Sequence, residues 1–348
     1  TQKLIGVANV LLGRVRGALG SVTVLASALF GAISGSAVAT VAAIGGMTIP
    51  AMKDEGYDPD YSAALSSAAS LLGPMIPPSI TLIVYAGLTE ASVQKLFLAT
   101  LTPAILCTVA FLAYTLWYGK KKNLPKQPKK TAKEAGKIML DAIWALLLPV
   151  IVLGLIFSGA TTVTEAAAVS CLYSAVVSLF IYKTITFKDL LKILGDSAVS
   201  IAAIMILVGM SKATAYVVIS SQMPQLFMDF ITSITDSRFV VLLIINVIFL
   251  ILGCLMEGNC IIVMMVPLLL TLVKSFGIDL LQFGVMSAIN IYIGCITPPV
   301  GVSLLLGCKL GKTSVGGTFK AILPFFAISM VILILVTYWP SFTLWLIH

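Results

Sequence analysis

The sequence predicts an all-α polytopic membrane protein built from two inverted repeats, each with a re-entrant helical hairpin and a broken helix. Three observations lead to this fold class. Of the 348 residues, 59% are hydrophobic and only 10% are charged, which leaves too little polar surface to cover a soluble globule. Several apolar stretches approach or exceed the roughly 20 residues that cross a bilayer core. Finally, a segment with consecutive prolines occurs once in each half of the chain.

Apolar stretches suited to membrane spans occur at 96–118, 138–158, 162–182, 197–220 and 318–340. Much of the net charge of +8 lies between the first two of them, in the run KKKNLPKQPKKTAKEAGK. A basic loop between spans is the ordinary mark of the cytoplasmic side. We therefore expect a cytoplasmic loop at 119–137, and the basic charge gives no reason to infer binding to nucleic acid.

An internal repeat underlies the predicted architecture. The segment LLGPMIPPSITLIVYAG (71–87) resembles YIGCITPPVGVSLLLGC (292–308) with a register shift of 221 residues, and the same shift places Asp58 on Asp279. Counting spans outward from the basic loop gives the two copies opposite orientations. Inverted repeats with discontinuous helices are typical of secondary transporters, whose binding sites lie near the bilayer midplane.

The pattern predicts the following order of segments. The chain starts at Thr1 with an amphipathic stretch, and we expect it to be a fragment that lacks earlier membrane segments. The expected segments are an amphipathic N-terminal segment 1–17, a first repeat 18–118 with hairpin 18–52 and broken helix 60–90, the basic loop 119–137, scaffold helices 138–192, and a second repeat 193–348 with hairpin 239–275 and broken helix 280–308.

The two proline pairs are the strongest motifs. They occur in GPMIPPS (73–79) and GCITPP (294–299). Consecutive prolines cannot donate helical N–H bonds and clash with the preceding turn, so the helix must open there. Opened carbonyls at membrane depth are tolerated only inside protein or around a cavity, where they can bind a cation. A kink without a ligand is the structural alternative.

The predicted hairpin turns carry small and polar residues, GAISGS at 31–36 and GCLMEGN at 253–259. Small residues there permit close approach of a ligand, although simple helix packing would use them too. Glu257 is an acid within an apolar run, and such acids usually face a cavity or a partner. It could bind a proton, a sodium ion or substrate hydroxyls. The alternative is that the hairpin tip is exposed to water and Glu257 binds nothing.

Other motifs indicate structure rather than chemistry. Thr162 and Glu165 have the spacing of a capping box that opens a helix. The six cysteines lie in apolar runs without CxxC spacing, so we expect them to be buried small hydrophobes. The sequence contains no nucleophile elbow, HExxH or P-loop, and therefore nothing indicates an enzyme.

With SGSAVATVAAIG, IPAMKDEGYDP, LLGPMIPPS, TVTEAAAV and GCITPPVG in this order, the chain resembles the large membrane subunit of tripartite ATP-independent periplasmic (TRAP) transporters along essentially its whole length. The resemblance implies an elevator-type transporter in the bacterial inner membrane. It implies sodium-driven uptake of an organic acid, delivered by a periplasmic substrate-binding protein, with a small Q-type membrane subunit as partner.

Substrates in this family are sialic acid, C4-dicarboxylates and other carboxylates. The only arginines of the chain are Arg14, Arg16 and Arg238, none of them in the expected site, which favours a sugar acid such as sialic acid over an acid with two carboxylates.

The resemblance also implies particular site residues. One sodium ion is expected at Ser34 with Gly73. Another is expected among four residues of the second repeat, namely Gly253, Gly294, Thr297 and the carbonyl of Val300. The polar residues expected to contact the substrate are Ser34, Ser79 and Glu257.

Two other functions remain open at this point. The chain could be a stand-alone sodium/dicarboxylate symporter of similar design. From a different class, it could be the membrane subunit of a sodium-translocating decarboxylase, in which carboxylate chemistry drives the ion.

Overall fold

The computed structural model describes residues 1–13, 15–126 and 131–347, so residues 127–130 of the predicted basic loop and residue 14 of the N-terminal segment lie outside it; within 187–220 it leaves the side chains of 207, 211, 212, 215 and 219 undescribed. Throughout the described ranges the regular secondary structure is helical. Seven of these helices are long and apolar enough to cross a membrane, or eight if a bent pair counts as one span. The predicted all-α fold with many spans is therefore confirmed.

The long helices follow the apolar stretches of the sequence. They are α8 (Val93–Lys121), α9 (Ala132–Phe157), α10 (Val163–Val176) with the π-helix η2 (Val177–Ile181), α11 (Phe187–Ser220), α13 (Arg238–Leu255), α14 (Gly258–Ser275) and α17 (Val315–Tyr338). The predicted boundary between 192 and 193 therefore falls inside α11.

Capping explains where two of these helices begin. The predicted capping box at Thr162 is confirmed: its hydroxyl accepts from Glu165 N at 3.2 Å, and the Glu165 carboxylate accepts from Thr162 N at 2.7 Å. A second box, Thr131 with Glu134, opens α9. Each box satisfies backbone N–H groups that the first helical turn leaves free.

The first hairpin comprises α2 (Ala18–Ser34), α3 (Ala37–Thr40), the π-helix η1 (Val41–Gly45) and α4 (Gly46–Asp54). Its tight turn depends on Gly35, which has φ 62° and ends α2. A side chain there would be strained by the left-handed backbone and would overlap the carbonyl oxygen of Pro78. Ser36 then caps α3 by accepting from Ala39 N at 3.4 Å.

Both proline pairs interrupt helices. The first broken helix is α5 (Pro59–Ala69), α6 (Leu72–Met75) and α7 (Ile80–Thr89), and the second is α15 (Leu280–Gly294) and α16 (Val302–Gly311). We call residues 76–79 the first break and residues 295–301 the second break. Asp58 and Asp279, which the register shift pairs, are the N-caps of α5 and α15.

The second hairpin is the pair α13 and α14, which meet at Met256 and Glu257. Three shorter helices complete the chain, namely α1 (Gln2–Leu12), α12 (Met223–Ile234) and α18 (Pro340–Leu344).

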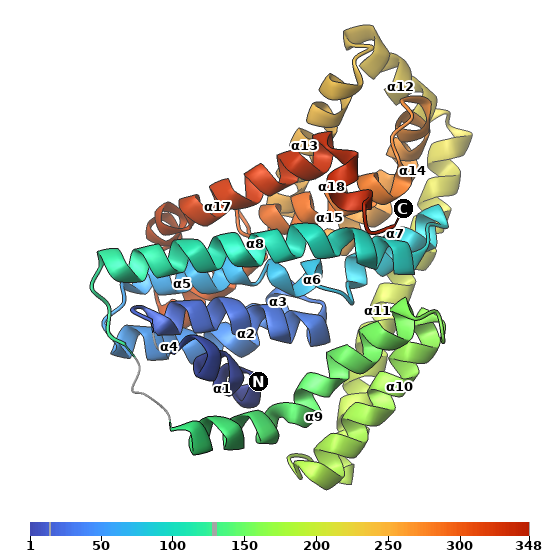
Figure 1. Cartoon of the computed structure of the whole chain (residues 1–348). Coiled ribbons are helices and arrows are strands. Elements are labelled where there is room, and N and C mark those ends of the chain that lie inside the picture. Colours follow the sequence, from blue (N-terminus) through green and yellow to red (C-terminus); the bar gives the residue numbers. More distant parts are fainter. Residues whose placement is uncertain (14, 127–130, 348) are drawn as a thin grey trace.

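The two broken helices pack against each other through small residues. The Ser67 hydroxyl on α5 donates to the Ser303 carbonyl of α16 at 3.1 Å, and a side chain on Gly307 would overlap that hydroxyl. In Figure 1, α8 and α17 run side by side, with α2 against α8. Helices α9 and α10, in green and yellow-green, pack against each other, with α9 also against α1, whereas α11 runs up to α14.

A cavity of about 510 Å³ lies between helices α9 to α11 and the first hairpin with the first broken helix. Ile33, Pro78 and Ile83 line it on one side, and Val152, Cys171 and Ile193 are among its lining on the other. The prediction of buried cysteines is confirmed for Cys107, Cys254 and Cys308, whereas Cys260 and Cys295 are half-buried. It is wrong for Cys171, which is exposed. The reason is that little of α10 is covered by the rest of the chain.

Candidate functional site

The first hairpin touches the first broken helix through two glycines. A Cβ atom added to Gly31 would lie 2.7 Å from the Cα of Gly73. A Cβ atom on Gly73 would lie 2.6 Å from the Thr40 hydroxyl and 2.9 Å from the Ser36 carbonyl oxygen. Because neither glycine has a side chain, the backbone of the hairpin turn reaches the backbone of the broken helix.

The second hairpin makes the corresponding contact. A Cβ atom on Gly253 would lie 3.1 Å from the Cα of Gly294, and one on Gly294 would lie 2.5 Å from the Cα of Gly253. The hairpin also binds the second break directly, because the Cys254 carbonyl accepts from Val300 N at 3.2 Å and Gly301 N at 3.3 Å. The contact thus brings together three residues that were predicted to share a site, namely Gly253, Gly294 and Val300.

A threonine hydroxyl that is hydrogen-bonded to a backbone carbonyl lies beside each contact. The Thr40 hydroxyl donates to the Ser36 carbonyl at 2.7 Å, and the Thr297 hydroxyl donates to the Ile293 carbonyl at 2.8 Å. Among the described residues, no group of three or more His, Cys, Asp or Glu side chains could hold a metal ion. Hydroxyl and carbonyl oxygens are the type of ligand that hard cations prefer.

A small cavity of about 80 Å³ lies between the two contacts, and all four hairpin and broken-helix elements line it. The first hairpin and first broken helix contribute Gly35, Ser36, Ala37, Val38, Pro74, Ile80 and Thr81. The second hairpin and second broken helix contribute Glu257, Gly258, Asn259, Tyr292, Cys295 and Val302. None of these thirteen residues is Lys, Arg or His, so the groups of the wall that could bind an anion are hydroxyls, amides and helix ends.

A series of hydrogen bonds runs across this cavity wall. The Thr81 hydroxyl donates to the Asn259 side-chain oxygen at 3.3 Å. The Asn259 side-chain nitrogen donates to Glu257 Oε1 at 3.0 Å. Glu257 Oε2 accepts from the backbone N–H of Asn259 at 2.9 Å and of Cys260 at 3.4 Å. These hydrogen bonds link the first half of the protein to the second.

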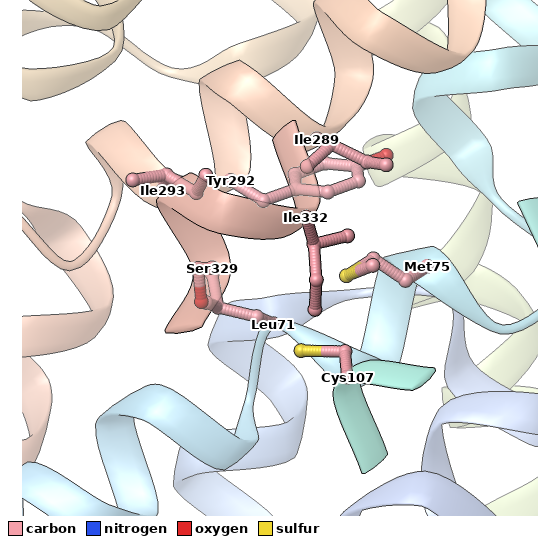
Figure 2. Close-up of a pocket in the computed structure, with 8 residues that line it drawn as sticks. All are labelled: Leu71, Met75, Cys107, Ile289, Tyr292, Ile293, Ser329 and Ile332. Atoms are coloured by element: carbon pink, nitrogen blue, oxygen red, sulfur yellow. The ribbon is translucent and has the colours of Figure 1, made fainter. Parts of the chain in front are cut away.

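Tyr292 forms another link between the halves. Its hydroxyl lies 2.9 Å from the Ser79 hydroxyl, and both side chains are buried. Figure 2 shows a neighbouring narrow space that Tyr292 lines together with Met75 of α6, Cys107 of α8 and Ser329 of α17. The space between them is too small for a water molecule, so the cavity is backed by a dry, close-packed core.

The predicted substrate contacts lie in different places. Glu257 lines the cavity but its carboxylate also caps α14. Ser34 is half-buried at the end of α2, where its hydroxyl accepts from Ser36 N at 3.4 Å. Ser79 is fully buried behind the cavity wall, bonded to Tyr292.

Sequence reasoning missed four polar residues that line the cavity. They are Ser36, Thr81, Asn259 and Tyr292. Ser36 and Asn259 lie in the predicted hairpin turns at 31–36 and 253–259, and Thr81 and Tyr292 lie in the two repeated segments around the proline pairs. The sequence therefore indicated their neighbourhood, but not which side chains face the cavity.

An all-helical protein with several membrane spans, whose hairpins and broken helices close around a polar cavity, has the architecture of a secondary transporter. A family model described as "Tripartite ATP-independent periplasmic transporter, DctM component" matches residues 1–342. The chain belongs to this family, which confirms the expected large membrane subunit of a TRAP transporter and a multi-pass protein of the inner membrane.

Known relatives support the assignment. The chain is 35% identical over 344 residues to the "Sialic acid TRAP transporter large permease protein SiaM" of Vibrio cholerae, covering 99% of the chain and 81% of that protein. It is 38% identical over 343 residues to the "C4-dicarboxylate TRAP transporter large permease protein DctM" of Pseudomonas aeruginosa, covering 99% and 80%. Both are named as transporter permeases and not as enzymes, in agreement with expectation.

The fold also resembles a solved structure. The crystal structure of the Alcanivorax borkumensis YdaH transporter superimposes with a TM-score of 0.62, covering 98% of this chain and 84% of that one. The sequence identity is 14%, so this similarity bears on the fold alone.

Proposed function

We propose that the chain drives sodium-coupled uptake of an organic acid across the inner membrane. The observation that carries the proposal is the 80 Å³ cavity, which has a hairpin contacting a broken helix on either side. In this proposal the substrate occupies the cavity and one sodium ion binds at each contact. Ser34 and Gly73 belong to the first ion site, and Gly253, Gly294, Thr297 and the carbonyl of Val300 belong to the second.

The partners and the movement are part of the same proposal. A periplasmic substrate-binding protein delivers the acid, and a small Q-type membrane subunit completes the complex, as the word "tripartite" in the family description suggests. The hairpins and broken helices move as one body in an elevator-type step against α9–α11. The names of the relatives point to sialic acid or a C4-dicarboxylate as substrate. The residues proposed to contact the substrate are Ser34, Ser79 and Glu257.

The experiment is uptake into proteoliposomes that contain the chain with its small subunit, supplied with the substrate-binding protein. Accumulation of a carboxylate is expected only under an inward sodium gradient. Equal uptake without the gradient would refute sodium coupling. Uptake that persists without the binding protein would instead favour a stand-alone symporter, and decarboxylation by the purified complex would favour a decarboxylase subunit.

We predict that Thr297→Ala and Ser34→Ala each raise the sodium concentration for half-maximal uptake by about tenfold, which corresponds to about 1.4 kcal/mol. Each change removes a hydroxyl from a proposed ion site. The matched control is Thr108→Ala, because the Thr108 hydroxyl donates to Ala104 O at 2.8 Å in the same way as Thr297 to Ile293, but on α8. An unchanged sodium requirement in both site variants would show that the sites are misplaced.

A further inference from the structure

The thirteen residues that line the small cavity include a single charged side chain, that of Glu257. Its carboxylate is exposed and accepts three hydrogen bonds, at 2.9 and 3.4 Å from backbone N–H groups of α14 and at 3.0 Å from the Asn259 side chain. A carboxylate at a helix N-terminus is stabilised by the N–H groups and by the helix dipole. The cavity wall therefore carries a negative charge that is held in one place.

The rest of the wall has the opposite character. Helices α7 and α16 both begin at the cavity, with Ile80 and Thr81 of α7 and Val302 of α16 in its lining. The first N–H groups of α16 are taken, because Ser303 N and Leu304 N donate to the Cys295 carbonyl. Helix α7 has no side-chain cap at its N-terminus, so its positive dipole end and the nearby Tyr292 hydroxyl suit a carboxylate. The cavity is thus polarised between the start of α7 and Glu257.

We propose that Glu257 determines the substrate class by admitting hydroxylated monocarboxylates and rejecting dicarboxylates. This inference rests on the proposed function. The single carboxylate of a sugar acid would lie toward the start of α7, and its hydroxyls would donate to the Glu257 and Asn259 oxygens. A second carboxylate would meet Glu257 within a cavity of about 80 Å³, where two like charges a few ångströms apart still repel, because the effective dielectric constant at a protein surface is well below that of bulk water.

Asn259 acts as a positioning residue in this arrangement. Its side-chain nitrogen holds Glu257, while its side-chain oxygen accepts from the Thr81 hydroxyl. The carboxylate is consequently held by its own helix and, through Asn259, by Thr81 of the first half of the protein.

The test measures acid binding to the purified complex of the chain and its small subunit, by calorimetry in sodium at constant ionic strength. Gluconate and glucarate form one pair, because they differ only in the terminal group, CH₂OH or carboxylate. N-acetylneuraminate and succinate form the second pair. We expect at least one monocarboxylate to bind, and to bind at least tenfold more tightly than its dicarboxylate partner. In Glu257→Gln this preference should fall by about tenfold, because glutamine can still accept from the N–H groups of α14 but carries no charge.

The matched control is Asp279→Asn. Asp279 is the N-cap of α15 and accepts from Leu281 N at 2.8 Å and Gln282 N at 3.0 Å, but it does not line the cavity. Its substitution should leave the preference unchanged, since asparagine is also a good N-cap.

The outcomes separate the two proposals. Equal binding of gluconate and glucarate by the unsubstituted complex, or an identical preference in Glu257→Gln and Asp279→Asn, would overturn the role of Glu257 and leave sodium-driven uptake intact. If none of the four acids binds in sodium, the inference fails. If uptake is also absent under a sodium gradient, the proposed function fails with it.

Discussion

Replacing Gly294 by alanine is expected to abolish uptake and to lower the thermal stability of the protein. The added Cβ atom would lie 2.5 Å from Gly253 Cα and 2.9 Å from Cys254 N, and it would also overlap the Gly253 carbonyl carbon. All three are backbone atoms, so no side chain can rotate away and the second hairpin must move off the broken helix. Overpacking of this kind costs about 1–3 kcal/mol or more.

The measurements are the unfolding temperature of the purified protein and uptake in proteoliposomes. The control is Gly154→Ala on α9, where an added Cβ atom meets nothing within 4 Å. Alanine favours a helix over glycine by about 0.5–1 kcal/mol, so this variant should be as stable as the parent or slightly more stable. Normal uptake by Gly294→Ala would contradict the close contact between hairpin and broken helix.

Removing the hydroxyl of Tyr292 should have the second largest effect. The Ser79–Tyr292 hydrogen bond of 2.9 Å is buried and joins the two halves of the protein. Tyr292→Phe leaves the Ser79 hydroxyl buried without this partner, at a cost of about 1–3 kcal/mol. Because Tyr292 also lines the small cavity, uptake should fall as well.

A double-mutant cycle tests whether the pair acts as one unit. Ser79→Ala alone should also destabilise the protein, and the double variant should cost less than the sum of the single ones, because neither hydroxyl is then left unpaired. Unfolding temperatures of the four proteins give the coupling. Strictly additive losses would mean that the two hydroxyls do not depend on each other.

The sequence predicts the fold well where the physical cause is local. Apolar stretches, the capping box at Thr162 and the helix breaks at Pro77 and Pro298 follow from hydropathy, side-chain capping and missing N–H donors. The placement of Gly253 with Gly294 followed from the resemblance to the TRAP family, and the structure brings the two glycines into contact.

The polar lining of the cavity could not be predicted in the same way, because it depends on how a helix starts. α7 begins at Ile80, and successive residues point in very different directions around a helix. Thr81 consequently faces the cavity, whereas Ser79, only two residues earlier, is buried against Tyr292. Asn259 and Tyr292 reach the same cavity from the other half of the chain, which only the tertiary structure determines.

The exposed thiol of Cys171 offers a natural position for a spectroscopic label. Of the six cysteines, three are buried, two are half-buried and this one is exposed. It lines the 510 Å³ cavity opposite Ile33 and Pro78. A fluorophore or spin label attached there, without any engineered cysteine, would report changes in the spacing between α10 and the first hairpin during turnover.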